Sequence, residues 1–174
     1  MSIINKSRKL AFLLRHDRNY VFDEHGWREV SDLLEYHGFS IDELHEIVKT
    51  NNKQRYEFSD NKKLIRARQG HSIAVDVELE KKLPPDTLYH GTSEESVESI
   101  ISLGIASRTR LHVHLSAQIE TAIKVGKRHG TPVVFMVDAK RMSEEGIAFY
   151  QSRNGVWLTS NVPSKYLKLI ADNK

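Results

Sequence analysis

Two short stretches of the chain combine arginine with histidine in a way that suits phosphate chemistry. Arg15 and His16 follow an apolar segment, and Arg66 and Arg68 alternate along a strand-like run, where alternation aims both side chains at one face. A guanidinium group offers a planar fork of donors to phosphate oxygens, and imidazole titrates near neutral pH. The alternatives are favourable contact of two cations with a helix C-terminus and a basic strand edge that discourages pairing.

A second group of candidates places histidine beside glycine and a hydroxyl residue. His90 is followed by Gly91 and Thr92, and His112 and His114 share one face of a later strand. Three histidines suggest a metal site, but neither motif contains the nearby carboxylate that metal-ligating histidines usually have, so we expect no metal. Two alternatives remain. The imidazoles and the glycine bind a nucleotide, or the histidines are core residues bonded to backbone carbonyls.

Two further stretches are ordinary when taken alone. Lys127 and Arg128 precede a glycine at the end of a predicted helix, which is typical of helix capping. Asn154-Gly155 before Val156 is typical of a turn that leads into an apolar strand. Neither stretch indicates a function by itself.

The elements that must position these residues fall into two predicted lobes, 1–80 and 81–174. In the first lobe the spacing predicts three helices and a two-stranded hairpin, which is the outline of a winged helix. The predicted elements are a helix ending near Arg15 or His16, a helix after Trp27 ended by Gly38, a helix begun by a Ser40–Glu43 capping box, and strands at 55–59 and 64–67.

The charged stretch 76–86, with its Pro84-Pro85 pair, predicts a linker before the second lobe. That lobe mixes strands at 88–90, 111–115, 132–137 and 155–159 with helices at 94–103 and 117–128. No helix is expected between the last two strands, which favours an α+β fold over a doubly wound parallel sheet. The glycine loops that hold dinucleotides or nucleotide triphosphates in such sheets are absent from the sequence.

Composition narrows the classes of protein. The 174 residues contain no cysteine, which excludes disulfides, thiolate metal sites and a cysteine nucleophile. No stretch approaches the roughly 20 apolar residues of a membrane span, so a soluble, cytoplasmic protein is expected.

The charge is unevenly distributed along the chain. The net charge is only +3, yet residues 17–46 carry two basic and nine acidic groups (2 − 9 = −7), and residues 49–68 carry seven basic and two acidic groups (7 − 2 = +5). The basic segment, with Lys53, Lys62 and Lys63, either contacts a polyanion or forms a solvated hairpin.

In this order the motifs resemble the RNA 2′-phosphotransferase family over nearly the whole chain. The motifs are LLRH at 13–16, IRARQGHS at 65–72, LYHGT at 88–92, HVHLS at 112–116 and NGVWLT at 154–159. The resemblance implies a winged-helix lobe followed by an ADP-ribosyltransferase-like lobe, with the active site in the cleft between them. It also implies that NAD is consumed as co-substrate without a metal, and that the partner is an RNA bearing an internal 2′-phosphate. A monomer, no membrane association and a role in tRNA processing complete this expectation.

The resemblance carries residue roles onto matching positions. The catalytic residues it implies are Arg15, His16, Arg66 and Arg128. The NAD-binding residues are His90, Gly91, Thr92, His114, Leu115, Ser116 and Val156, and the residues that contact RNA or phosphate are Arg68, Gln69, His71 and Asn154. Val156 stands where related enzymes that modify proteins often have Glu, which suits a nucleophile that is already an anion. Arg68 departs from the family, where Asn is usual.

The implied reaction has two steps. The RNA 2′-phosphate displaces nicotinamide from NAD, and the ribose 2″-hydroxyl then attacks phosphorus, which releases RNA with a 2′-hydroxyl and ADP-ribose 1″,2″-cyclic phosphate. Two alternatives stay open: an ADP-ribosyltransferase that acts on nucleic-acid ends or another acceptor and stops after the first step, and a winged-helix nucleic-acid binder without catalysis.

Overall fold

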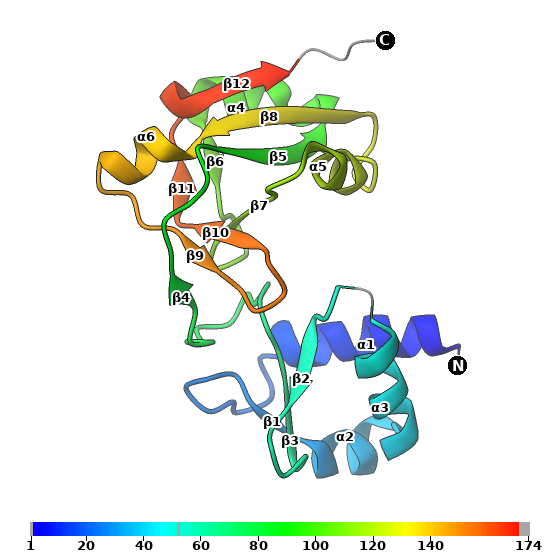
Figure 1. The fold of residues 1–174 in the computed structure, drawn as a ribbon. Helices are drawn as coiled ribbons and strands as arrows, with labels where there is room; N and C mark the ends of the chain where they lie inside the picture. Colours follow the sequence, from blue (N-terminus) through cyan, green and yellow to red (C-terminus); the bar gives the residue numbers. More distant parts are fainter. Residues whose placement is uncertain (1, 52, 171–174) are drawn as a thin grey trace. The chain divides into compact units, whose positions relative to one another are not determined.

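The computed structural model describes residues 2–51 and 53–170 (Figure 1). The chain folds into two compact units: unit 1 consists of Met1–Leu79 and Thr109–Leu111, and unit 2 of Glu80–Arg108 and His112–Lys174. The short segment Thr109–Leu111 belongs with unit 1, where the backbone N–H of Leu111 donates to the carbonyl of His71 at 3.1 Å. No helix within the described residues is long and apolar enough to cross a membrane.

Within its described residues, unit 1 contains three helices and one small antiparallel sheet with the strand order β1-β3-β2. Its elements are α1 (Ile3–Arg15), β1 (Arg28–Glu29), α2 (Val30–His37), α3 (Ile41–Thr50), β2 (Tyr56–Phe58) and β3 (Leu64–Ala67). The three predicted helices and both predicted strands are therefore confirmed, and β1 is an additional short strand paired with β3.

Local sequence explains where these helices begin and end. The Ser40–Glu43 capping box forms at the start of α3, and α2 ends at Gly38, whose φ of 68° lies in the left-handed region that glycine tolerates. On α1, Leu10, Leu13 and Leu14 are buried at the helical spacing that places them on one face. Together with residues of α2, α3 and the sheet they form the core of unit 1.

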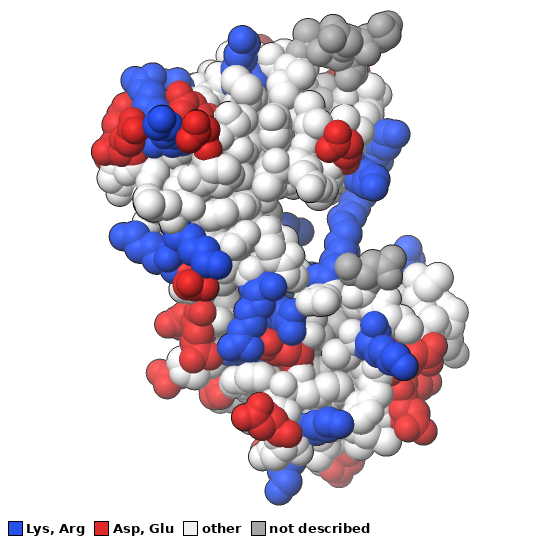
Figure 2. All heavy atoms as spheres, in the orientation of Figure 1, with Lys and Arg blue, Asp and Glu red and all other residues white. Residues whose placement is uncertain are grey.

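The surface charge of unit 1 follows the sequence. The exposed acidic residues of α3 include Asp42 and Glu46, and Figure 2 shows acidic side chains along this edge of the unit. The edge formed by α3 is therefore unsuited to bind a polyanion.

Unit 2 contains helices and several small antiparallel sheets, which is compatible with the expected α+β class. Its strands are β4 (Glu80–Lys81), β5 (Thr87–Ser93), β6 (Ile105–Ala106), β7 (Val113–Leu115), β8 (Pro132–Asp138), β9 (Tyr150–Gln151), β10 (Trp157–Thr159), β11 (Asn161–Val162) and β12 (Leu167–Ile170). Its helices are α4 (Val97–Leu103), α5 (Ile119–Gly126) and α6 (Ala139–Glu144), with 3₁₀ turns η1 (Glu94–Ser96) and η2 (Ser164–Tyr166).

The sheets have the strand orders β12-β8-β5, β4-β9-β10-β7 and β11-β6. A bridge between Tyr89 and Ser116 connects β5 with the end of β7. Apolar residues from β5, β7, β8, β10 and α6, including Leu88, Phe135 and Trp157, form the core of this unit.

One expectation for this part of the chain is wrong. A helix does lie between the last two predicted strands: α6 spans only six residues, too few to show a helical period, and Asp138 caps it by accepting from the N–H of Arg141. The boundary between the two units, after Leu79, lies inside the predicted linker 76–86, which also contains the short strand β4, paired with the two-residue strand β9. Strands of two residues carry no alternation that a sequence pattern can reveal.

Candidate active site

The C-terminal end of α1 lies against the segment 70–72. His16 caps the helix, and the backbone N–H of Ser72 donates to the carbonyl of Arg15 at 3.0 Å. The helix end and the segment after β3, which are more than fifty positions apart in sequence, are thereby joined. The structure brings together Arg15, His16 and His71, three of the residues that the sequence singled out.

The guanidinium group of Arg15 is the most unusual polar group in this cluster. Its Nε and Nη2 atoms are buried, and within the described residues neither has a hydrogen-bond partner. Burial lowers the pKa of Arg15 to about 10, so the group is still a cation at neutral pH. Buried donors are almost always paired, so this site is built for an acceptor that the protein itself does not supply.

Gly70 makes room for this guanidinium. A Cβ atom at Gly70 would lie 3.4 Å from Cζ of Arg15, and the φ of Gly70 is +88°, which side chains rarely adopt. On another side the ring of Tyr56 lies with its centroid 5.8 Å from the same Cζ atom. The backbone at Gly70 and the Tyr56 ring therefore fix the position of the cation.

His16 is held by Ser72. Its Nδ1 atom lies 2.9 Å from Oγ of Ser72. Burial lowers the pKa of His16, and the positive charges of Arg15 and Arg110 lower it further. The imidazole is therefore neutral at pH 7 and can accept a proton.

His71, expected to contact RNA or phosphate, lies in the interior of unit 1. Its side chain is only 2% exposed. Burial lowers its pKa to about 3, with smaller contributions from Arg15, His16 and Arg66. Its Nε2 atom is buried and has no partner within the described residues, and it lies 3.4 Å from where a Cβ of Gly26 would be. His71 is a neutral, buried neighbour of the Arg15 guanidinium.

Arg66 on β3 and Arg68 just after it both bond to one carboxylate, so their side chains lie on the same side, as alternation predicts. Nε of Arg66 donates to Oε1 of Glu57 at 2.8 Å, and Nε of Arg68 donates to Oε2 at 3.1 Å. Nη1 of Arg66 also donates to Glu78 at 3.0 Å, and its Cζ lies 4.4 Å from the centroid of the Trp27 ring. Arg66 is thus buried and engaged with two carboxylates. Gln69 follows in the turn that leads to Gly70 and is half-buried.

In unit 2, His90 on β5 and His114 on β7 share one pattern of hydrogen bonding. Nδ1–H of His90 donates to the carbonyl of His114 at 3.3 Å, and Nδ1–H of His114 donates to the carbonyl of His112 at 3.1 Å. A carbonyl can only accept, so Nδ1 carries a proton in both rings. Burial lowers the pKa of His90, which keeps it neutral.

Gly91 has a packing role that the sequence did not reveal. A Cβ atom there would lie 1.7 Å from the carbonyl oxygen of Ala122 on α5, and one at Gly126 would lie 2.6 Å from the carbonyl oxygen of Thr92. These contacts join the backbones of β5 and α5. The close neighbour of Gly91 is a helix of the protein itself.

The remaining candidates of unit 2 lie around these strands. Leu115 is buried in the core, while Ser116 forms the bridge to Tyr89. Val156 precedes β10 and is half-buried, and its N–H donates to Oγ of Ser152, which itself donates to Oδ1 of Asn154. Arg128 is exposed just beyond α5. Among the residues that the structure describes, no group of three or more His, Asp or Glu side chains is placed to hold a metal ion.

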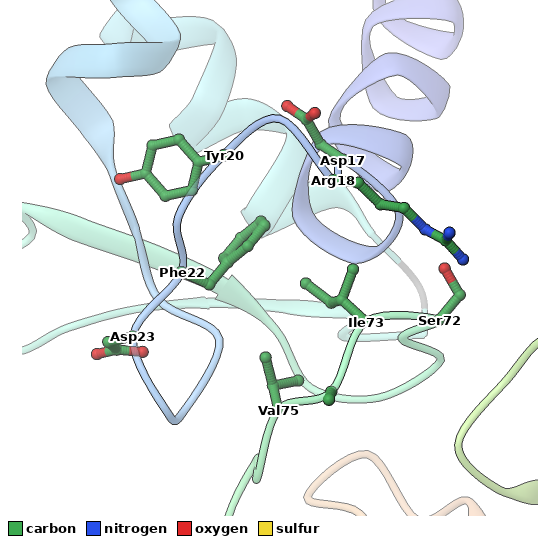
Figure 3. A pocket seen from close by; sticks show the side chains of 9 residues that line it. Asp17, Arg18, Tyr20, Phe22, Asp23, Ser72, Ile73 and Val75 are labelled. Atoms are coloured by element: carbon green, nitrogen blue, oxygen red, sulfur yellow. The ribbon is translucent and has the colours of Figure 1, made fainter.

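A pocket of about 400 Å³ lies in unit 1 beside the Arg15–His16 cluster (Figure 3). It is lined by Asp17, Arg18, Tyr20, Phe22, Asp23, Ser72, Ile73, Ala74 and Val75. Ser72 therefore belongs both to the pocket lining and to the hydrogen bond with His16.

Comparison with known proteins decides the family. Residues 2–161 match the family described as RNA 2′-phosphotransferase, Tpt1 / KptA family. The chain belongs to this family. The resemblance drawn from the motifs is confirmed, as is the prediction of an enzyme.

Individual relatives are similar over most of their length. A protein named probable RNA 2′-phosphotransferase from Hahella chejuensis is 45% identical over 174 residues, which cover 95% of this chain and 94% of that protein. Proteins with the same name from Trichormus variabilis and Fusobacterium nucleatum are 48% and 44% identical, covering 83% and 95% of this chain and 82% and 97% of those proteins.

Several residues of the candidate site were not predicted from the sequence. Ser72 stands in a recognised motif but was given no role, although its hydroxyl contacts His16. Glu57 was also missed, and the hairpin register offered the signal, since Glu57 is the cross-strand partner of Arg66. Gly70 lies within the motif at 65–72 but was given no role, and Glu78 carried no sequence signal, because their contacts with Arg15 and Arg66 arise only from the folded loops.

Proposed function

We propose that this protein is an NAD-dependent RNA 2′-phosphotransferase that carries out the two-step reaction described above. The family supports the activity, and the two buried, unpartnered donors of Arg15 are the observation that carries the assignment of the phosphate site. A phosphoryl group offers anionic oxygens to such donors, and it satisfies both at once because a guanidinium binds it as a fork. RNA bearing an internal 2′-phosphate is the proposed substrate.

Arg15 binds and polarises the phosphoryl group. In the first step a 2′-phosphate oxygen forms a bond to the ribose carbon that carries nicotinamide, and the bond to the nicotinamide nitrogen breaks. In the second step the 2″-hydroxyl bonds to phosphorus while the bond to the RNA 2′-oxygen breaks. Charge on the phosphoryl oxygens has to be stabilised in that step, and a fixed guanidinium does this without reorganisation.

His16 handles the proton of the second step. The neutral imidazole accepts the proton of the attacking hydroxyl and then returns a proton to the RNA 2′-oxygen, which leaves as a hydroxyl group. Its lowered pKa supports the base role, because the unprotonated form dominates at pH 7. The contact with Ser72 orients the ring.

The residues of unit 2 fit a ligand rich in hydroxyl groups. NAD would supply the reactive ribose carbon and the nicotinamide leaving group. Burial keeps the His90 ring neutral by lowering its pKa, so its Nε2 is an acceptor, which suits a ribose hydroxyl donor, and His114 lies beside it through the bond from His90 Nδ1–H to the His114 carbonyl. We assign NAD binding to these two residues with Thr92, Ser116 and Val156, whereas Gly91 and Leu115 act by packing their strands.

The other arginines receive more specific roles. For Arg66 to contact a phosphoryl oxygen, we propose that it exchanges its bond with Glu78, whose side chain is 53% exposed, and keeps its bond with Glu57, whose side chain is 8% exposed. Arg128 is exposed at the end of α5 and is proposed as a further phosphate ligand. Arg68, Gln69 and Asn154 are proposed to contact the RNA backbone.

We also propose a fold for each of the two units, based on their secondary structure. Three helices followed by an antiparallel hairpin support a winged helix for unit 1, and the small antiparallel sheets with α4 and α5 support an ADP-ribosyltransferase-like fold for unit 2.

One assay tests the function. The protein is incubated with NAD and an RNA that carries one internal 2′-phosphate, and nicotinamide, RNA and cyclic phosphate are followed in time. Equal molar release of nicotinamide, dephosphorylated RNA and cyclic product is expected. A stable ADP-ribosylated RNA without cyclic product would instead identify a transferase that stops after the first step. No nicotinamide release would overturn both assignments and leave an RNA binder.

A further inference from the structure

The pocket in unit 1 has an apolar wall that is partly open to solvent. Tyr20, Phe22, Ile73 and Val75 are all half-buried, and Figure 3 shows Phe22, Ile73 and Val75 around a common space between two loops. A volume of about 400 Å³ lies within the range of small-molecule sites. These four side chains form the apolar part of a pocket whose other lining residues include the polar Asp17, Asp23 and Ser72.

The aromatic wall is held in place before any ligand binds. The rings of Tyr20 and Phe22 meet edge to face with centroids 4.9 Å apart. The buried guanidinium of Arg28 lies over the Tyr20 ring at 4.1 Å from its centroid, and the Tyr20 hydroxyl accepts from the N–H of Glu29. A wall fixed in this way loses little side-chain freedom when a ligand stacks on it.

The carboxylates of the pocket are already engaged by the protein. Asp17 forms an ion pair with Arg28 at 2.9 Å, and Oδ1 of Asp23 accepts from the backbone N–H groups of His25 and Trp27. Arg18 is exposed at the rim and adds a positive charge there. The pocket therefore suits a neutral, flat group attached to an anionic backbone better than it suits a cation.

The pocket continues from the proposed phosphate site through Ser72. The same side chain lines the pocket and contacts Nδ1 of His16, and Ser72 also bonds to the backbone of Arg15. An RNA strand whose 2′-phosphate lies on Arg15 therefore has its next nucleotide within reach of the pocket.

We propose that this pocket binds the base of a nucleotide adjacent to the 2′-phosphorylated nucleotide of the RNA. The proposal rests on the proposed function and adds a second recognition element to it. Proteins bind single-stranded RNA by splaying its bases onto apolar and aromatic side chains, and such stacking is tolerant of base identity. The pocket thus recognises the presence of a neighbouring base in the strand.

The test uses trinucleotides with a 2′-phosphate on the central residue. One trinucleotide is complete, a second lacks the base of the 5′ nucleotide, and a third lacks the base of the 3′ nucleotide. Affinities are measured without NAD, and turnover is measured with NAD. For the wild-type protein we expect one of the two base deletions to weaken binding about ten-fold, as loss of one stacked base does.

Two matched variants test whether the loss of affinity on base deletion depends on the pocket. Ile73→Asp places a charge inside the pocket, and Val21→Asp places the same charge in the same loop region at a side chain that is 92% exposed and outside the lining. The base-dependent difference in affinity should disappear in Ile73→Asp and persist in Val21→Asp. Phe22→Leu, which keeps an apolar side chain, should reduce the difference, and thermal unfolding verifies that each variant is folded.

The outcomes separate the two proposals. If wild-type protein turns over the complete trinucleotide but neither base deletion weakens binding, the base pocket is wrong and the proposed function stands. The same conclusion follows if Ile73→Asp and Val21→Asp respond alike, or if an apolar peptide competes for the pocket while the abasic trinucleotides bind as well as the complete one. Absence of any turnover would contradict the proposed function itself.

Discussion

Oγ of Ser72 lies 2.9 Å from Nδ1 of His16, so a residue after β3 controls the ring of a residue at the end of α1. The hydroxyl can also donate to the carbonyl of Arg15 at 3.5 Å, which leaves its lone pair for Nδ1–H. In that arrangement Nδ1 of His16 carries the proton and Nε2 is the unprotonated acceptor.

Ser72→Ala should therefore lower kcat more than it raises KM. Loss of one orienting hydrogen bond costs about 1 kcal/mol, so kcat should fall about five-fold. Ser72→Thr keeps the hydroxyl and should restore most of the rate. Steady-state kinetics of the three proteins provide the measurement, and equal kcat values for wild type and Ser72→Ala would show that Ser72 does not orient the base.

Arg15→Met should make the protein more stable but inactive. The variant removes a buried cation with two unpartnered donors but keeps an unbranched side chain, so the free energy of unfolding should rise by about 1 kcal/mol. Removal of 2′-phosphate should be abolished. Urea denaturation with and without inorganic phosphate is the measurement. Phosphate should stabilise the wild type only, and equal stabilisation of the variant would remove Arg15 from the phosphate site.

His71 should make the fold sensitive to acid. Its pKa is about 3 in the folded protein against an ordinary value of 6.5, so the unfolded chain binds the extra proton between these values. Stability from the neutral ring is fully present above pH 6.5 and decreases as the pH falls toward 3, with a slope approaching ~1.4 kcal/mol per pH unit.

The test compares thermal unfolding of wild type and His71→Gln at several pH values from 7.5 to 5. The wild type should lose more stability across this range than the variant. Parallel pH profiles for the two proteins would show that another group controls the acid response.

Glu57 and Glu78 should differ in their effect on stability. Glu57 is 8% exposed and accepts from both Arg66 and Arg68, so Glu57→Gln leaves two guanidinium groups short of a charge partner and should cost about 3 kcal/mol. Glu78 is half-exposed, so Glu78→Gln should cost less than 1 kcal/mol. Urea denaturation measures both, and a reversed order would contradict the assignment of Glu57 as the structural partner.

The sequence predicted features that depend on neighbouring residues, and it did not predict contacts between residues far apart in the chain. The helices of unit 1 were predictable because capping at Ser40 and the left-handed glycine at Gly38 are local signals. The alternation that puts Arg66 and Arg68 on one face is equally local. The carboxylates that hold these arginines were not predicted as partners, because Glu78 reaches Arg66 through a loop twelve residues away.

The same reasoning explains what was missed in unit 2. A glycine beside a histidine suggested room for a nucleotide, yet the backbone that occupies the space at Gly91 belongs to Ala122, thirty-one positions later. Two-residue strands such as β9 and β11 exist only through pairing with partners elsewhere in the chain. Sequence patterns report local periodicity, so they do not reveal such contacts.

The contact of α5 with β5 has a consequence for tuning the enzyme. Gly91 and Gly126 bring the two backbones together with no side chain between them, so direct main-chain contact sets the spacing between β5, which carries His90, and the end of α5, two residues before Arg128. Side-chain repacking therefore has no means of adjusting this spacing. The position of Arg128 relative to β5 therefore depends on the length of the turn after α5. Insertions or deletions in this turn are the way to change that position.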